Sequence, residues 1–204
     1  MKKIIILVIS MVYLAGTAAG QDFITISEAF KRSYSYENES KFTEASGELI
    51  KVYEANSYEI NIRLGWLTYK DSSYSESMEY YQKAIDLKPF AIEPRLGYVT
   101  PAAAAGNWNQ VEEQYNKILT VDPMNTTANY WLGVIFYNRE QFDTALRYFE
   151  KVANLYPFDY DCTIMYAWTN YKMQKLREAK VLFQKALLIN PGDTSALQGL
   201  GLIQ

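Results

Sequence analysis

Apolar and aromatic positions recur along this chain at intervals of 34 residues. The recurring positions are Tyr74, Trp108, Phe142 and Leu176; Tyr81, Tyr115, Phe149 and Phe183; and Leu87, Val121, Leu155 and Ile189. Prolines at positions 89, 123, 157 and 191 keep the same interval, as do lysines at 83, 117, 151 and 185. A fixed period of this length indicates a solenoid built from one repeated supersecondary unit.

Each unit has the pattern of two helices followed by a proline. In the unit that begins at Thr126, the first helix carries Leu132-Gly133 and the second carries Ala145 and Phe149. A small residue lets two helix backbones approach, and the aromatic ring fills the space beside them. Proline suits the end of a unit because it cannot continue a helix. We therefore predict helix pairs that start at Tyr58, Ile92, Thr126 and Tyr160.

The two ends of the chain depart from the regular period. Residues 27–38 and 42–54 have the pattern of one more helix pair, shifted in phase by two residues, with Asn56-Ser57 in place of the proline. Residues 194–204 begin another unit that stops after one helix. Solenoids need a polar capping element, so this fragment is either a frayed half-cap or an edge that another chain covers.

One interior unit also departs, because Pro101 falls well inside its first helix. A proline there removes a backbone hydrogen bond and clashes with the preceding turn, which predicts a kink. The small residues 102–105 follow directly. Either the neighbouring helices accommodate the bend, or the bend widens a groove for a ligand.

The pattern resembles the tetratricopeptide repeat. The matching positions are Leu64-Gly65, Leu132-Gly133, Phe136, Ala145, Phe149, Ala179, Phe183, Ala186 and the four prolines. The early tryptophan of the family consensus is replaced by Asn61, Arg95, Asn129 and Thr163. The resemblance implies an all-α fold, an α-α superhelix of about five helix-turn-helix repeats plus a C-terminal half-repeat. The expected boundaries are 26–57, 58–91, 92–125, 126–159, 160–193 and 194–204, within one solenoid over residues 21–204.

The resemblance also implies a concave groove lined by the first helices, which in this family binds a segment of another protein. Projected onto this sequence, the groove residues are Tyr34, Arg63, Trp66, Tyr69, Lys70, Tyr130, Tyr137, Asn138, Trp168, Tyr171 and Lys172, with Trp131 beside them. Tyrosine and tryptophan are typical of interface hot spots. We expect Trp131 to be more buried than Trp66 or Trp168. Arg63, Lys70 and Lys172 are either contacts to an acidic partner or, as we expect, ordinary solvated charges. Ile62 and Trp66 stand where the family's carboxylate-binding versions carry lysine and asparagine, so we expect no capture of a C-terminal carboxylate.

Residues 1–20 have the pattern of a cleaved secretory signal peptide. Lys2 and Lys3 precede the apolar run 4–15, and small residues follow at 16–20. The run is shorter than the roughly 20 residues of a spanning helix. We therefore expect export to the periplasm or extracellular space and a soluble chain with no membrane insertion after cleavage. Without Lys2 and Lys3 the basic residues fall from 20 to 18 against 23 acidic ones, a net charge of −5.

This composition argues against catalysis and against nucleic-acid binding. The mildly acidic chain lacks the basic surface that nucleic acid requires. It contains no histidine, which removes the usual general base and zinc ligand. Cys162 is the only cysteine, so it has no intrachain disulfide partner and is expected to be a buried apolar residue. Acidic pairs such as Glu28 with Glu37, Glu112-Glu113, and Asp159 with Asp161 are expected to be solvated.

Three functional hypotheses follow. The first is a non-catalytic scaffold or adaptor in a bacterial envelope, with no cofactor and no metal, which docks a protein or peptide in an aromatic groove. The second is a structural protein that self-associates through its C-terminal edge. The third is a carbohydrate-binding module, because rows of aromatic rings also stack on sugars.

Overall fold

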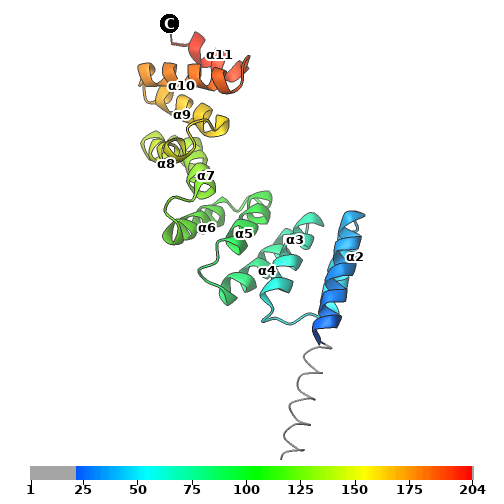
Figure 1. Cartoon of the computed structure of the whole chain (residues 1–204). Helices are drawn as coiled ribbons and strands as arrows, with labels where there is room; N and C mark the ends of the chain where they lie inside the picture. The colour runs from blue at the N-terminus through cyan, green and yellow to red at the C-terminus, as the bar shows by residue number, and fades with distance from the viewer. Residues whose placement is uncertain (1–21, 204) are drawn as a thin grey trace, which may run out of the picture. The chain divides into compact units, whose positions relative to one another are not determined.

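A computed structural model describes residues 22–203, which are helical with no β-strand in that range (Figure 1). The all-α fold of helix pairs is therefore confirmed. The chain divides into two compact units, with the boundary between Asn107 and Trp108. The expected signal peptide lies outside the described residues.

The first unit contains the expected helix pairs and the first helix of the next pair. Its elements are a helix over residues 22–38, α2 (Phe42–Ile50), α3 (Tyr58–Lys70), α4 (Tyr74–Leu87) and α5 (Glu93–Ala104). The first helix already includes residues 22–26, which precede its predicted start at residue 27. Helix α2 ends four residues earlier, because the N–H groups of Val52 and Tyr53 bond three residues back, to Leu49 and Ile50, in tight turns.

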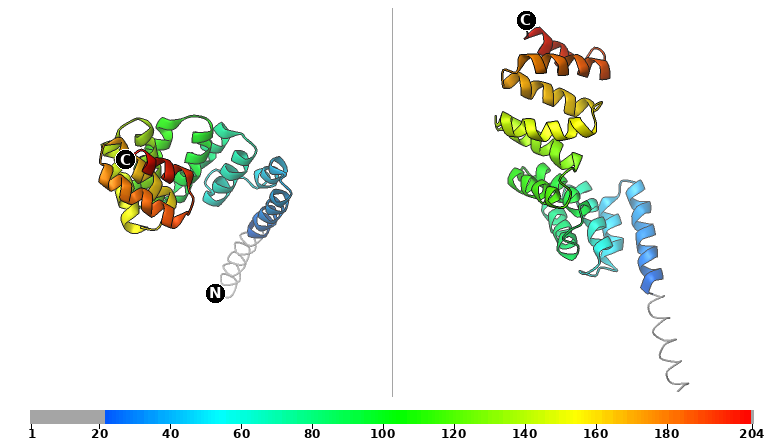
Figure 2. Two further views of the ribbon diagram at one scale, coloured as in Figure 1. Left: turned by 90° about the horizontal axis from the view of Figure 1, so that it is seen from above. Right: turned by 60° about the vertical axis from the view of Figure 1, so that its left-hand side comes forward.

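The second unit continues the same alternation. Its elements are α6 (Trp108–Val121), α7 (Thr126–Asn138), α8 (Phe142–Leu155), α9 (Tyr160–Lys172), α10 (Leu176–Ile189) and α11 (Thr194–Gly201). Each helix packs against the next along the chain, and α7 to α11 lie in successive layers (Figure 2). Because each repeat contacts its neighbours, the hydrophobic core continues from one layer to the next.

The turns between helix pairs explain the fixed position of the prolines. Each of the four prolines lies two residues after the second helix of its pair ends. In three of these turns a polar residue two positions further on caps the next helix. The side chains of Asn125, Asp159 and Asp193 accept the N–H groups of Ala128, Cys162 and Ala196. Such caps satisfy backbone donors that a helix start leaves free.

The turns inside the pairs share a second device. One residue in each has a positive φ: Ser40, Ser72, Gly106, Glu140 and Gln174, with φ between 59° and 76°. The last four are spaced by 34 residues, whereas Ser40 precedes Ser72 by 32. This left-handed conformation ends the first helix and turns the chain into the second.

The recurrent aromatic of α4, α8 and α10 (Tyr81, Phe149 and Phe183) fills the space beside a glycine. An added Cβ at Gly133 would lie 2.7 Å from the Phe149 ring, and one at Gly199 would lie 2.3 Å from the Phe183 ring. Phe149 and Phe183 are completely buried. The predicted pairing of small and aromatic residues is therefore confirmed, and it extends to the following repeat, since Gly199 belongs to α11.

The residues that replace the consensus tryptophan are polar tethers. Asn61, Arg95 and Asn129 each donate to a carbonyl six residues earlier, those of Ala55, Pro89 and Pro123. The hydroxyl of Thr163 donates to the carbonyl of Asp159. These bonds fix each first helix to the turn before it.

Two further expectations concern single residues. Helix α5 continues through Pro101 to Ala104, and Ala102 is completely buried. Cys162 is a buried free thiol, as predicted. Its Sγ donates to the carbonyl of Phe149 at 3.3 Å, and burial raises the pKa of the thiol to about 12.

Candidate functional site

The first unit gathers five of the predicted groove residues next to one carboxylate, that of Glu37. We call Tyr34, Glu37, Arg63, Trp66, Tyr69 and Lys70 the N-terminal cluster. The helix over residues 22–38 supplies the first two, and α3 supplies the others. The 3.6-residue period of α3 places Arg63, Trp66 and Lys70 on one side of that helix.

Glu37 holds the cluster together. Its Oε1 accepts the indole N–H of Trp66 at 2.6 Å, and its Oε2 accepts from the guanidinium of Arg63. Burial by itself would raise the pKa of Glu37, but the hydrogen bonds from Arg63 and Trp66 outweigh it and hold the pKa below its ordinary value. Glu37 is therefore ionised at neutral pH and orients both partners.

Arg63 differs from the expectation of a solvated charge. It is 8% exposed, paired with Glu37, and its guanidinium lies 3.9 Å from the centre of the Tyr34 ring. The prediction failed because the partner is 26 residues away on another helix, beyond what local spacing reveals. Arg63 is a positioning residue for Tyr34 rather than a free contact for an acidic ligand.

The outer side of the cluster is aromatic. Tyr34 is 51% exposed and Trp66 is 39% exposed. Tyr69 is half-buried, 5.9 Å from Trp66, and the amine of Lys70 lies 5.5 Å from the Trp66 ring. Rings already fixed by neighbours lose little freedom on binding, which favours their use as contact points.

In the second unit, Trp168 and Tyr171 form a smaller aromatic pair on α9. The Trp168 ring lies 5.6 Å from Tyr171 and 4.9 Å from the buried Phe183 of α10. Its indole N–H donates to Ser195 of α11 at 2.8 Å. Trp168 is thus half-buried and held by three helices. Lys172, at the end of α9, is exposed.

Tyr130 and Tyr137 on α7 are half-buried, and burial raises the pKa of both hydroxyls. Tyr130 packs edge-on against Phe149 at 6.1 Å, and Tyr137 against Phe142 at 5.4 Å. Asn138, next to Tyr137, is exposed. The rings of these two tyrosines therefore lie at the edge of the core, with one part buried and one part exposed.

The predicted burial of Trp131 is wrong. Trp131 is 42% exposed, slightly more than Trp66, whereas Trp168 is the tryptophan packed against the core. On α7 the core-facing positions are held by Asn129, Leu132 and Gly133, which turns Trp131 outward. Its ring meets the edge of Tyr130 at 5.4 Å.

A pocket of about 390 Å³ opens beside Trp131. Its lining comes from the start of α7, the end of α8 and the start of α9: Thr126, Thr127, Tyr130, Trp131, Val152, Tyr156, Asp159 and Asp161. The volume lies at the small end of the range for ligand pockets, about 300–1,000 Å³. It combines aromatic walls with two carboxylates.

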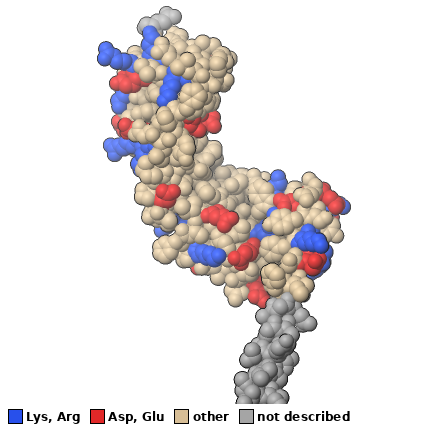
Figure 3. All heavy atoms as spheres, viewed as in Figure 1, with Lys and Arg blue, Asp and Glu red and all other residues tan. Residues whose placement is uncertain are grey.

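Within residues 22–203, no three potential metal-ligating side chains come together. None of the helices in this range has the length and apolarity to cross a bilayer. On the face drawn in Figure 3, acidic and basic side chains are interspersed on each unit. Of the acidic pairs expected to be solvated, Glu112 forms an ion pair with Arg139 at 2.6 Å, and Glu37 is the centre of the N-terminal cluster.

Two groups of functional interest were missed by sequence reasoning. Glu37 is expected from sequence to be a solvated acid, because its partners Arg63 and Trp66 lie 26 and 29 residues further along the chain. Thr126 was overlooked as well, although Tyr58 and Tyr160 occupy the same place in their repeats. A position-by-position comparison of the repeats would have shown that Thr126 stands where these two repeats have tyrosine.

Comparisons with known proteins agree with the repeat period. Residues 58–90 match the tetratricopeptide repeat model, and residues 105–186 match the model of subunit 3 of the anaphase-promoting complex, or cyclosome. The human protein O-mannosyl-transferase TMTC1 is 29% identical over 156 residues, and the RNA polymerase-associated protein CTR9 of Caenorhabditis elegans is 27% identical over 101. These alignments cover 74% and 49% of this chain but only 18% and 9% of the relatives, so the chain spans less than a fifth of their length.

Solved structures show the same fold at low sequence identity. A tetratricopeptide repeat protein from Parabacteroides merdae has a TM-score of 0.76 and 16% identity, covering 88% of this chain and 72% of that one. MamA has a TM-score of 0.71 and 17% identity, covering 81% and 91%, and MamA from Desulfovibrio magneticus has 0.71 and 15%, covering 83% and 97%. With its 34-residue period and its matched repeat, the chain carries tetratricopeptide repeats and has the fold of tetratricopeptide repeat proteins.

Proposed function

We propose that this protein is a non-catalytic scaffold or adaptor that binds a segment of another protein on the aromatic surface of its first helices. The observation that carries the proposal is the N-terminal cluster, where Tyr34 and Trp66 are exposed yet held by Arg63 and Glu37. Large aromatic faces fixed before binding are the profile of interface hot spots.

The repeat fold supports a binding role over a catalytic one. One matched family model is named for a subunit of the anaphase-promoting complex, and one relative is named as a protein associated with RNA polymerase. Another relative is named as an O-mannosyl-transferase, but this chain aligns with only 18% of it. The absence of histidine from the whole sequence also disfavours most acid-base chemistry.

We place this activity outside the cytoplasm, in the periplasm or cell envelope of a bacterium, on the pattern of residues 1–20. Self-association and carbohydrate binding are the competing functions. A self-associating protein would bind copies of this chain, and a carbohydrate-binding module would bind glycans, whereas a scaffold would bind a different protein.

The test is affinity capture from envelope extract with the full chain as bait. The variant bait carries Tyr34→Ser and Trp66→Ala, and the control bait carries Phe90→Ser, which changes an aromatic residue of the first unit that is 82% exposed and outside the cluster. Circular dichroism checks that all three baits keep their helix content. Trp168 is left unchanged, because it packs against Phe183 and its loss would disturb the core.

A protein partner kept by the control bait and lost by the variant bait supports the proposal. Recovery of the same partner by all three baits would refute a role for the cluster. Recovery of this chain alone would favour self-association, which light scattering over a range of concentrations then measures.

A further inference from the structure

The repeats of this chain differ in how they hold the acids at the start of the next first helix. Helices α3 and α9 both begin with a tyrosine. The hydroxyl of Tyr58 donates to Glu93 at 3.1 Å, and that of Tyr160 donates to Asp193 at 2.6 Å. Each tyrosine thus ties its own repeat to the acid at the beginning of the following one.

Helix α7 begins with Thr126 at the position of these tyrosines. In the 34-residue register, Asp161 corresponds to Glu93 and Asp159 corresponds to Asp193. Both acids are present at the start of α9, but the tyrosine that holds one such acid in each of the other two cases is missing. Threonine is too short to reach across as tyrosine does.

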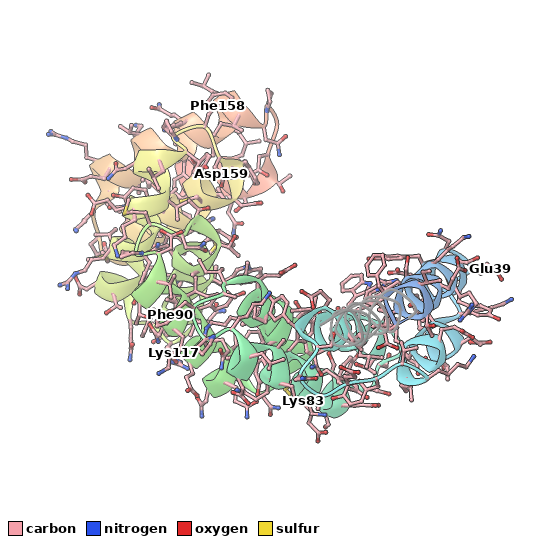
Figure 4. All side chains as sticks on the ribbon, turned by 60° about the horizontal axis from the view of Figure 1, so that its bottom comes forward. Glu39, Lys83, Phe90, Lys117, Phe158 and Asp159 are labelled. Carbon is pink, nitrogen blue, oxygen red and sulfur yellow. The ribbon has the colours of Figure 1, made fainter. Side chains whose placement is uncertain are left out.

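Within the described residues, neither carboxylate accepts a tyrosine hydroxyl, and neither is paired with a cation. One oxygen of Asp159, which lies in the turn between α8 and α9 beside Phe158 (Figure 4), accepts the N–H of Cys162 at 2.8 Å. No lysine or arginine of residues 22–203 forms an ion pair with Asp159 or Asp161. Both residues are exposed and line the pocket beside Trp131.

The walls of this pocket are suited to a cation. Tyr130, Trp131 and Tyr156 face it with aromatic side chains. Tyr156 stands at the register position of Lys88, whose amine lies 3.9 Å from the centre of the Tyr58 ring in the first unit. At Tyr58 the chain supplies both the ring and the cation, whereas the pocket beside Trp131 has rings and carboxylates but no cation of its own.

We infer that this pocket binds an arginine side chain of a partner protein. The guanidinium group is planar, stacks on aromatic rings, and presents several N–H donors that match carboxylate oxygens. It would occupy the place that the tyrosine ring and hydroxyl fill in the other repeats. This inference rests on the proposed scaffold function and names one chemical feature of the partner.

The chain itself suggests the decisive variant. Thr126→Tyr introduces the residue that Tyr58 and Tyr160 place at this position, so it fills the pocket and gives the acids their hydroxyl partner. Because two repeats already fold with this tyrosine, the variant is expected to keep its helix content. Asp161→Asn removes one charge, and Asp143→Asn is the matched control, an exposed acid of the same unit that does not line this pocket.

Binding is measured with the peptide acetyl-Gly-Arg-Gly-amide, which needs no knowledge of the natural partner. The full chain is labelled with 5-fluorotryptophan, and the ¹⁹F resonance of Trp131 is assigned from Trp131→Phe. Matched peptides carry citrulline, which has the shape of arginine without its charge, or lysine.

We expect a saturable shift of the Trp131 resonance with the arginine peptide, weaker binding of the lysine peptide, and none with citrulline. Asp161→Asn should weaken arginine binding up to about fivefold, the upper range for a solvent-accessible ion pair. Asp143→Asn should change nothing, and Thr126→Tyr should abolish the shift.

Equal response to arginine and citrulline, equal affinity for lysine, no shift at all, or unchanged binding by Thr126→Tyr would each overturn the inference. The outcome is separable from the scaffold test, because that test alters Tyr34 and Trp66 in the first unit. A scaffold that captures its partner but ignores the arginine peptide would refute the pocket alone. A chain that binds the peptide but captures no protein would refute the scaffold and leave a cation pocket.

Discussion

Replacing Gly97 with alanine tests the packing between consecutive repeats. Gly97 lies in α5, and a Cβ added there would be 2.2 Å from Cε1 and 2.5 Å from Cζ of the Tyr81 ring. The ring has little room to withdraw, because Tyr81 is 5% exposed and its other edge lies 2.9 Å from the Cβ position of Gly65. Real Cβ atoms do not approach a ring this closely, so the ring or the helix must move.

Two opposing effects set the magnitude. Alanine is favoured over glycine in a helix interior by about 1 kcal/mol, whereas overpacking a well-filled core costs about 1–3 kcal/mol. Since the contact is so short, we expect the upper part of that range and a net loss of about 1–2 kcal/mol. Gly47→Ala in α2 is the matched control, because nothing lies within 4 Å of the added methyl and only the gain of about 1 kcal/mol should appear.

Equilibrium unfolding in urea, followed by circular dichroism, measures both free energies. The same Gly97→Ala change is then made with Tyr81→Leu, which removes the ring. If the clash causes the loss, alanine at position 97 becomes neutral or stabilising in that background, a coupling of at least about 1 kcal/mol. A Gly97→Ala variant as stable as Gly47→Ala, or a loss that persists without the ring, would refute this account of the packing.

Three further predictions concern single side chains. The pKa of Glu37 is lower in the folded chain than its ordinary value of 4.5, so its stabilisation is present above that value and is lost as the pH falls through the folded pKa. On acidification the urea midpoint of Glu37→Gln should therefore fall less than that of the unmodified chain. An equal fall of the two midpoints would contradict this. Cys162, with a pKa of about 12, should not react with Ellman's reagent at pH 8 until urea unfolds the chain, so prompt reaction would argue against its burial. Asn129→Ala should cost about 1–3 kcal/mol in urea unfolding, because the buried Asn129 amide donates to the carbonyls of Pro123 and Asn125 and each such bond contributes about 0.5–1.5 kcal/mol, whereas the exposed Asn138→Ala should stay within about 0.5 kcal/mol.

Much of the fold could be predicted from the sequence, because a stack of repeats depends mainly on local, recurring signals. The interval between Pro89 and Pro123 marks where each pair ends, and Gly133 opposite Phe149 marks where two helices approach. Each of these signals acts within one repeat or between adjacent repeats. Their repetition reinforces a pattern that would be ambiguous in a single copy.

The polar contacts could not be predicted in the same way. In the sequence, Asn61 and Asn129 are recognisable only as replacements of the consensus tryptophan, although both side chains bond to the preceding turn. Arg63 is likewise predicted to be solvated, although it pairs with Glu37. Such pairs depend on which residue of the neighbouring repeat faces the side chain. A hydrophobic period does not specify that, since any polar residue can occupy an outward position.

Sequence by itself determined the helix pairs, their turns and the small-to-aromatic contacts of the core. Only the tertiary structure decided that Trp131 turns outward while Trp168 packs on Phe183, and that Thr126 leaves Asp159 and Asp161 beside an open pocket. The physical reason is that helical periodicity fixes which side of a helix is apolar, whereas the rotation and spacing of neighbouring helices fix which side chains meet there.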